Sequence, residues 1–201
     1  MSTLAPPHPL AAGFHSFRRF SVDEYHRMID AGILTDEDQV ELLEGYVVLK
    51  MPRNPPHDGS IQLAQETVSR AVPPGWCIRI QSTVTLPDSE PEPDLTLARG
   101  TSRTYLKRHP TPADIGLLIE IANTSVDRDR DDKTRIYARA AIPFYWIVNL
   151  PDTRVEVYTQ PSGPTTAPAY AQRQDYHSGD LIPLVLDGVT VASVQAADLL
   201  P

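Results

Sequence analysis

Apolar residues in the second half of this chain gather into short runs separated by one helical pattern. Residues 117–122 and 142–150 are nearly continuous apolar runs, typical of strands covered on both faces, and 95–98 is a shorter run. Residues 127–141 predict a helix between the first two runs, and the alternation at 155–158 predicts a hairpin partner. This order of elements indicates an α/β fold with a mixed central β-sheet flanked by helices.

The N-terminal half predicts further helices and strands. Ser21 and Glu24 form a capping-box pattern, which starts a helix that ends near Ala31, before Gly32. The other expected elements are a strand, a turn at Gly45 and a second strand within 40–51, a helix at 57–72, a strand at 76–86, short strands near 170–177, 181–184 and 189–191, and a final helical turn at 196–199.

The length of 201 residues predicts a flexible leader at 1–18, rich in Pro, Ala and His, and a single domain at 19–201. No apolar run could span a bilayer, and no secretory signal pattern precedes the domain, so we expect a cytoplasmic protein without a membrane partner. Cys77 is the sole cysteine, and its alternating neighbours predict a half-buried strand position rather than a nucleophile. The six histidines lack the paired spacing of a zinc site.

A formal net charge of -8 counts against a dedicated nucleic-acid-binding surface, because phosphate contacts come from basic patches. A nuclease site is itself acidic before its metal binds, however. Arg99, Arg103, Lys107 and Arg108 also form a basic segment after the 95–98 strand. This segment is either a phosphate contact or an ordinary solvated loop.

The most informative charged residue is Glu120, which lies within the apolar run 117–122. A carboxylate in a buried strand is costly unless a basic group or a metal ion compensates it. Asp94 lies directly before the 95–98 strand, so it is the best second ligand. Glu90 and Glu92 approach the same strand in an extended segment, but we expect them in solvent.

A lysine shares the apolar face of the predicted helix. Ile136, Tyr137, Ala140 and Ala141 follow Lys133 by three, four, seven and eight positions, which places all five residues on one side. The side chains expected to point elsewhere are those of Asp131, Asp132, Arg135 and Arg139. Lys133 is therefore predicted to face Glu120, and Tyr137 to serve packing rather than chemistry.

An aspartate, a glutamate and an inward lysine suggest a magnesium-dependent phosphodiesterase site, because Mg²⁺ binds through one or two carboxylates with water and substrate phosphate. Considered alone, Glu41 and Glu44 are better interpreted as exposed acids. His57 is better interpreted as a loop residue than as part of the pocket.

Five segments together resemble the Uma-type family of putative restriction endonucleases in the PD-(D/E)XK nuclease superfamily. They are Glu41-Leu42-Leu43-Glu44-Gly45, Glu92-Pro93-Asp94-Leu95, Leu118-Ile119-Glu120-Ile121-Ala122, Asp129 through Lys133 to Tyr137, and Ile142-Pro143-Phe144-Tyr145-Trp146-Ile147-Val148. Each motif is weak alone, whereas their order and spacing make the set fairly specific.

The resemblance implies a mixed four-stranded core sheet and a site that hydrolyses DNA. Asp94 and Glu120, with the Ile121 carbonyl, would hold Mg²⁺ or Mn²⁺, and Glu41 would line the same pocket. The common superfamily pattern has its lysine two residues after the glutamate, where this chain has Ala122. The family supplies this lysine from the helix that follows the strand, and Lys133 is the matching residue in this chain.

In the implied mechanism, the cation polarises the scissile phosphate and lowers the pKa of a bound water, and Lys133 positions that water or stabilises developing charge. Glu41 orients the lysine or a second ion. A homodimer fits double-strand cutting. The alternatives are a non-catalytic nuclease-fold protein that binds nucleic acid or protein, and a metal-free core in which Glu120 and Lys133 form a buried ion pair.

Overall fold

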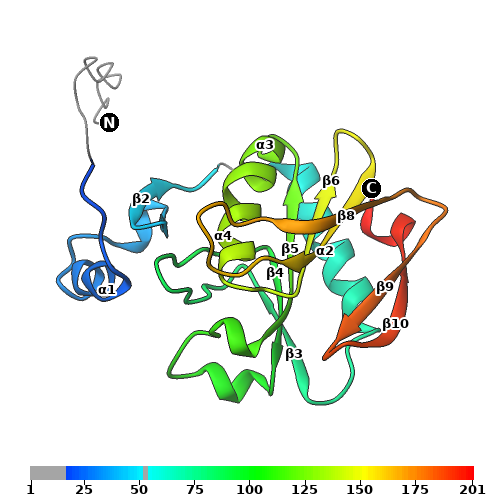
Figure 1. The fold of residues 1–201 in the computed structure, drawn as a ribbon, viewed down its shortest axis with the longest axis horizontal. Coiled ribbons are helices and arrows are strands. Elements are labelled where there is room, and N and C mark those ends of the chain that lie inside the picture. Colours follow the sequence, from blue (N-terminus) through cyan, green and yellow to red (C-terminus); the bar gives the residue numbers. More distant parts are fainter. Residues whose placement is uncertain (1–16, 52–53) are drawn as a thin grey trace.

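A computed structural model describes residues 17–51 and 54–201 of the chain. Its centre is a six-stranded sheet in the order β3-β4-β5-β6-β7-β8 (Figure 1). The strands are β3 (Trp76–Ile80), β4 (Leu95–Arg99), β5 (Ile115–Ala122), β6 (Phe144–Asn149), β7 (Arg154–Pro161) and β8 (Tyr170–Tyr176). Among these six strands of the described chain, only β5 and β6 pair in parallel. The predicted mixed sheet is confirmed, with two strands more than the four that the resemblance implies.

A helical segment connects the two parallel strands, as parallel pairing requires. It consists of α3 (Val126–Arg128), a π-helical turn η4 (Asp129–Lys133) and α4 (Thr134–Arg139). A helical segment is present where the helix was predicted. The expectation of uninterrupted helical spacing was wrong at two points. The π turn interrupts it, and Ala141 is exposed with a φ of +57°, so this residue does not share the buried face.

The two faces of the sheet carry separate apolar clusters. Leu117, Ile119 and Ile121 of β5 pack toward helix α2 (Pro55–Ser69), whereas Leu118 and Ala122 pack with α4. The first face is also covered by β9 (Leu181–Leu186), β10 (Val189–Gln195) and the short helix η5 (Ala196–Leu199) (Figure 1). Because side chains alternate along a strand, Glu120 faces α4 with Leu118.

Gly116 lies at a register shift between β4 and β5 and is closely surrounded by side chains. A Cβ atom at this position would lie 2.6 Å from the ring of Trp76 and 2.6 Å from Leu186. Glycine is therefore required here by packing.

The N-terminal segment lies at one side of the sheet (Figure 1). Its elements are α1 (Val22–Asp30), η1 (Asp36–Asp38), β1 (Val40–Leu43) and β2 (Tyr46–Leu49). The predicted capping box at Ser21 and Glu24 is confirmed by both hydrogen bonds. Glu44 and Gly45 both have positive φ, as in the tight turn that suits a two-residue hairpin.

Several predicted boundaries differ in the structure. The strand predicted at 76–86 ends at Ile80, and Gln81 has a φ of +43°. Cys77 is partly buried in β3, as expected. The leader predicted at 1–18 lies almost wholly outside the described residues. Within the described ranges, every helix is too short or too polar to cross a membrane.

Two short helices follow β4, namely η2 (Ser102–Tyr105) and η3 (Pro112–Asp114). They belong to the stretch that contains the basic segment predicted at 99–108. Arg99 pairs with Asp187, and Arg108 pairs with Asp114 at 2.6 Å. These two arginines are thus neutralised by nearby acids.

Candidate active site

A pocket of about 80 Å³ opens where Asp94 enters β4 and where β5 ends. This volume accommodates several water molecules. The pocket walls include every residue predicted for the site, namely Glu41, Asp94, Glu120, Ile121 and Lys133. Residues separated by as many as 92 positions in the sequence are therefore brought together.

Asp94 lies directly before β4, and the pairing of Leu95 with Ile119 places it beside the end of β5. Its Oδ2 atom accepts a hydrogen bond of 2.8 Å from the Ile121 N–H and lies 3.2 Å from His57 Nε2. Burial alone would raise the pKa of Asp94, but His57, the Ile121 N–H and the charge of Lys133 lower it. Asp94 is thus held as a carboxylate.

Glu120 is 3% exposed and lies on the face of the sheet that α4 covers. Its Oε1 atom lies 2.8 Å from Lys133 Nζ and accepts a hydrogen bond of 2.8 Å from the Tyr137 hydroxyl. Burial raises the pKa of Glu120 to about 8, against the attraction of Lys133 and with the repulsion of Asp129. The predicted approach of Lys133 to Glu120 is observed, and Tyr137 contributes a polar contact as well as packing.

Lys133 ends the π turn and is buried. Its Nζ atom contacts Glu120 and lies 3.6 Å from Asp129 Oδ1. Burial alone would lower the pKa of Lys133, but the Glu120 and Asp129 carboxylates raise it instead. The side chain is therefore a protonated hydrogen-bond donor.

Asp129 lines the pocket but was not among the residues predicted for the site. It is buried, accepts a hydrogen bond of 2.6 Å from Ser125 Oγ, and faces Lys133 one turn away. Burial raises the pKa of Asp129. Its position four residues before Lys133 on the predicted helix was the signal that could have identified it.

His57 lies in the first turn of α2, so the loop interpretation was wrong. The Asn54 side chain caps this helix by accepting a hydrogen bond of 3.2 Å from the His57 N–H. The imidazole lines the pocket beside Asp94, and that contact raises the pKa of His57. The cap thus fixes a histidine against the predicted metal ligand.

The acids expected in solvent are largely buried. Glu41 is 5% exposed and lies 2.9 Å from Arg128 Nη2. Glu90 is buried between His26, at 2.7 Å, and Thr85. Two further acids are partly buried and paired, Glu92 with Lys50 at 2.7 Å, and Glu44 with Arg135 at 2.7 Å and with Arg139. The expectation of solvated acids was wrong because each has a basic or hydroxyl partner distant in sequence.

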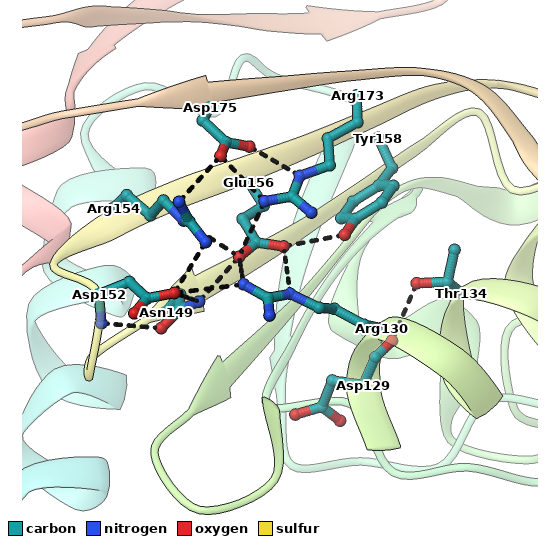
Figure 2. A network of polar contacts seen from close by, with 10 residues as sticks. All are labelled: Asp129, Arg130, Thr134, Asn149, Asp152, Arg154, Glu156, Tyr158, Arg173 and Asp175. Carbon is teal, nitrogen blue, oxygen red and sulfur yellow. Dashed lines mark hydrogen bonds and ion pairs between the residues drawn. The ribbon is translucent and has the colours of Figure 1, made fainter. Parts of the chain in front are cut away.

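A second polar network anchors the π turn from its other side (Figure 2). Arg130 reaches the fully buried Glu156 of β7, at 3.0 Å from Nε to Oε2, while the adjacent Asp129 side chain turns away from this network. Asn149 and Tyr158 each donate a further hydrogen bond of 2.8 Å to Glu156. Burial alone would raise the pKa of Glu156, but Arg130 and these donors lower it to about 2. The network fixes the turn that carries Asp129 and Lys133.

The donor set fits a hard divalent cation that retains water. Among the described residues no group of three or more His, Cys, Asp or Glu is arranged to hold a metal. Mg²⁺, however, needs only one or two protein carboxylates. Asp94 is held as a carboxylate, and Glu120 and Asp129, whose pKa values burial raises, would release protons when such a cation binds.

Comparison with known proteins agrees with this architecture. A family model described as "Uma2: Putative restriction endonuclease" matches residues 22–194. No curated protein matches the chain. Among solved structures it resembles one described as "a putative nuclease belonging to DUF820" from Anabaena variabilis, with a TM-score of 0.61 and 16% identity over 90% of this chain and 97% of the other. This structural likeness confirms the predicted nuclease-like fold.

Proposed function

We propose, because this chain belongs to the Uma2 family of putative restriction endonucleases, that it is a metal-dependent endonuclease that hydrolyses DNA phosphodiester bonds. The observation that carries the proposal is the meeting of Asp94, Glu120 and Lys133 in one pocket, with Glu41 in its wall. Two carboxylates can hold a magnesium ion, and an ammonium group can stabilise the charge that develops on a phosphate.

Asp94 and Glu120, with the Ile121 carbonyl, are the proposed ligands of Mg²⁺ or Mn²⁺. When bound, such a cation supplies Lewis-acid polarisation of the phosphate and a lower pKa for water. His57 orients Asp94 through its 3.2 Å contact, and Tyr137 orients Glu120 through its hydroxyl. These contacts hold the two carboxylates in place before substrate arrives.

Lys133 acts as a donor rather than as a base, because the neighbouring carboxylates keep it protonated. Its ammonium group can hold the attacking water and stabilise charge developing on the phosphate. Asp129 is a second carboxylate near the ammonium group, at 3.6 Å. Glu41 contacts Arg128 directly, so its effect on Lys133 is electrostatic.

Thermal stability tests the cation site separately from catalysis. Titration with Mg²⁺ or Mn²⁺ should raise the melting temperature of the wild type, since a ligand of the native state stabilises it. Asp94→Ala should remove this increase. Equal stabilisation of both proteins would contradict the site, and no stabilisation of either would support the metal-free ion-pair interpretation.

Cleavage of supercoiled plasmid tests catalysis. The wild type should nick or linearise the plasmid with Mg²⁺ or Mn²⁺ and not with EDTA, and Lys133→Met should lose this activity at a temperature where circular dichroism shows it folded. Lys107→Met is the matched control, because Lys107 is exposed and lies outside the pocket. Cleavage that survives Lys133→Met would remove the lysine from the mechanism. Cation binding without cleavage by the wild type would favour the non-catalytic alternative.

The cytoplasmic location and the homodimer are also proposals. Light scattering of the purified chain, with and without DNA, measures the oligomeric state. A monomer under both conditions would contradict the dimer.

A further inference from the structure

Four charged residues form a closed ring at the mouth of the pocket. Arg128 Nη2 lies 2.9 Å from Glu41 Oε1, and Glu41 Oε2 accepts a hydrogen bond of 3.3 Å from the Glu92 N–H. Glu92 Oε2 in turn lies 2.7 Å from Lys50 Nζ. Arg128 closes the ring by donating a hydrogen bond of 3.1 Å to the carbonyl oxygen of Leu49, the residue before Lys50. These contacts link the two cations, and both line the same pocket.

Lys50 and Arg128 are more exposed to solvent than Lys133. The side chains of Lys50 and Arg128 are 22% and 21% exposed, whereas that of Lys133 is 10% exposed. Lysine has three N–H donors and arginine has five. Within the described part of the chain, the ring contacts use one donor of Lys50 and two of Arg128. The rest can reach a ligand at the pocket mouth.

The chemistry of these donors suits a phosphate. Arginine presents a planar fork and lysine a compact charge, and both bind the nucleic-acid backbone. Inside the pocket, Lys133 is occupied by two carboxylates. In the basic segment, Arg99 and Arg108 already have acidic partners. Lys50 and Arg128 are thus cations placed to receive a substrate strand that enters this acidic site.

We propose that Lys50 and Arg128 bind the backbone phosphate that flanks the scissile phosphate of the nucleic acid, and so align the strand across the pocket. The inference rests on the proposed nuclease function and adds a substrate-binding site to it. Glu41 and Glu92 position the two cations and keep the mouth neutral in the absence of DNA.

The test measures binding of a short fluorescent DNA duplex by anisotropy in Ca²⁺ buffer, over a salt series. Lys50→Gln is the cleaner variant, because its partner Glu92 is partly exposed and tolerates the loss. Loss of one phosphate contact should lower the slope of log affinity against log salt by about 1. The affinity advantage of the wild type should therefore shrink about fourfold between 50 and 200 mM salt.

Arg128→Lys keeps a charge beside the buried Glu41, so it should retain most of the salt slope, while Arg128→Gln should lose about 1. Glu92→Gln removes a negative charge from the mouth and should tighten binding. Arg70→Gln is the control, because Arg70 is exposed at the C-terminal end of α2 and lies outside the pocket. If Lys50→Gln and Arg70→Gln change the slope equally, the site is refuted.

Steady-state cleavage separates this inference from the function on which it rests. Lys50→Gln should raise KM and leave kcat unchanged, as expected for a group that binds substrate and transition state equally. If the wild type cuts DNA and Lys50→Gln has unchanged KM and salt slope, the phosphate site alone fails. If the duplex binds with the predicted slopes and is never cut, the nuclease proposal alone fails.

Discussion

Replacement of Lys133 by methionine tests the electrostatics of the pocket most directly. Methionine retains an unbranched stem of similar size but removes the ammonium group. That group lies 2.8 Å from Glu120 and 3.6 Å from Asp129, and both carboxylates are buried. The variant therefore leaves two acids in the interior without their principal counter-ion.

The expected magnitude follows from this burial. Removing one partner of a buried ion pair typically costs about 3–5 kcal/mol. In a domain of this size, that loss lowers the melting temperature by about 6–20 °C. A fall in this range would place Lys133 among the strongest single contributors to the stability of the chain.

The loss should depend on pH in a defined direction. Burial already raises the pKa of Glu120 to about 8, and removal of Lys133 raises it further. A carboxyl group with a folded-state pKa above its unfolded value contributes stability at low pH and loses it as pH rises. At pH 5 Glu120 is neutral in both folded proteins, whereas at pH 8 it is partly ionised beside Lys133 in the wild type and less so in the variant, so the cost of Lys133→Met should be larger at pH 8.

Urea denaturation followed by circular dichroism measures this difference. The double variant Lys133→Met with Glu120→Gln should recover more than about 1 kcal/mol of the single loss, because the second change removes a carboxylate that the first left unpaired. Equal losses at both pH values, together with additive effects in the double variant, would refute the reasoning.

Three further predictions concern other parts of the molecule. Gly116→Ala should destabilise the fold by about 1–3 kcal/mol in urea, because the new Cβ lies 2.6 Å from the Trp76 ring, while Gly179→Ala, which meets no atom within 4 Å, should stay within about 0.5 kcal/mol. Glu156 has a pKa lowered to about 2, so its stabilising effect is present above the unfolded value near 4.5 and is lost as pH falls through 2; Glu156→Gln should flatten this part of the acid-denaturation profile, and an unchanged profile would contradict the assignment. Mg²⁺ affinity measured by calorimetry should increase with pH up to about 8, because binding releases the proton of Glu120; a pH-independent affinity would exclude Glu120 as a ligand.

Local sequence patterns predicted the elements that obey a simple period. Helical spacing placed Lys133 on a buried face, and the apolar run around Glu120 predicted a buried strand, as observed. The same spacing failed at Ala141, because the helix ends at Arg139 and the chain turns through a positive φ. A period holds only while the backbone remains regular.

The surroundings of the acids could not be predicted in this way. Glu41 and Arg128 are 87 positions apart, and Glu90 and His26 are 64 positions apart. Each of these residues is of a type that usually lies on the solvated surface. Only the folded chain brings the partners together. His57 was misjudged for the same reason, since its partner Asp94 lies on a different element.

The alternation of β5 has a consequence for how the sheet aligns during folding. A shift of this strand by one residue would turn Glu120 toward the apolar cluster beneath α2. The ammonium group of Lys133 would remain on the opposite face of the sheet. Both charges would then be buried without compensation, so the misaligned sheet is heavily penalised. We infer that this charged pair helps to specify the register of β5 in the sheet. A variant with an apolar pair in its place should recover part of the stability that Lys133→Met loses, while showing broadened, heterogeneous amide resonances.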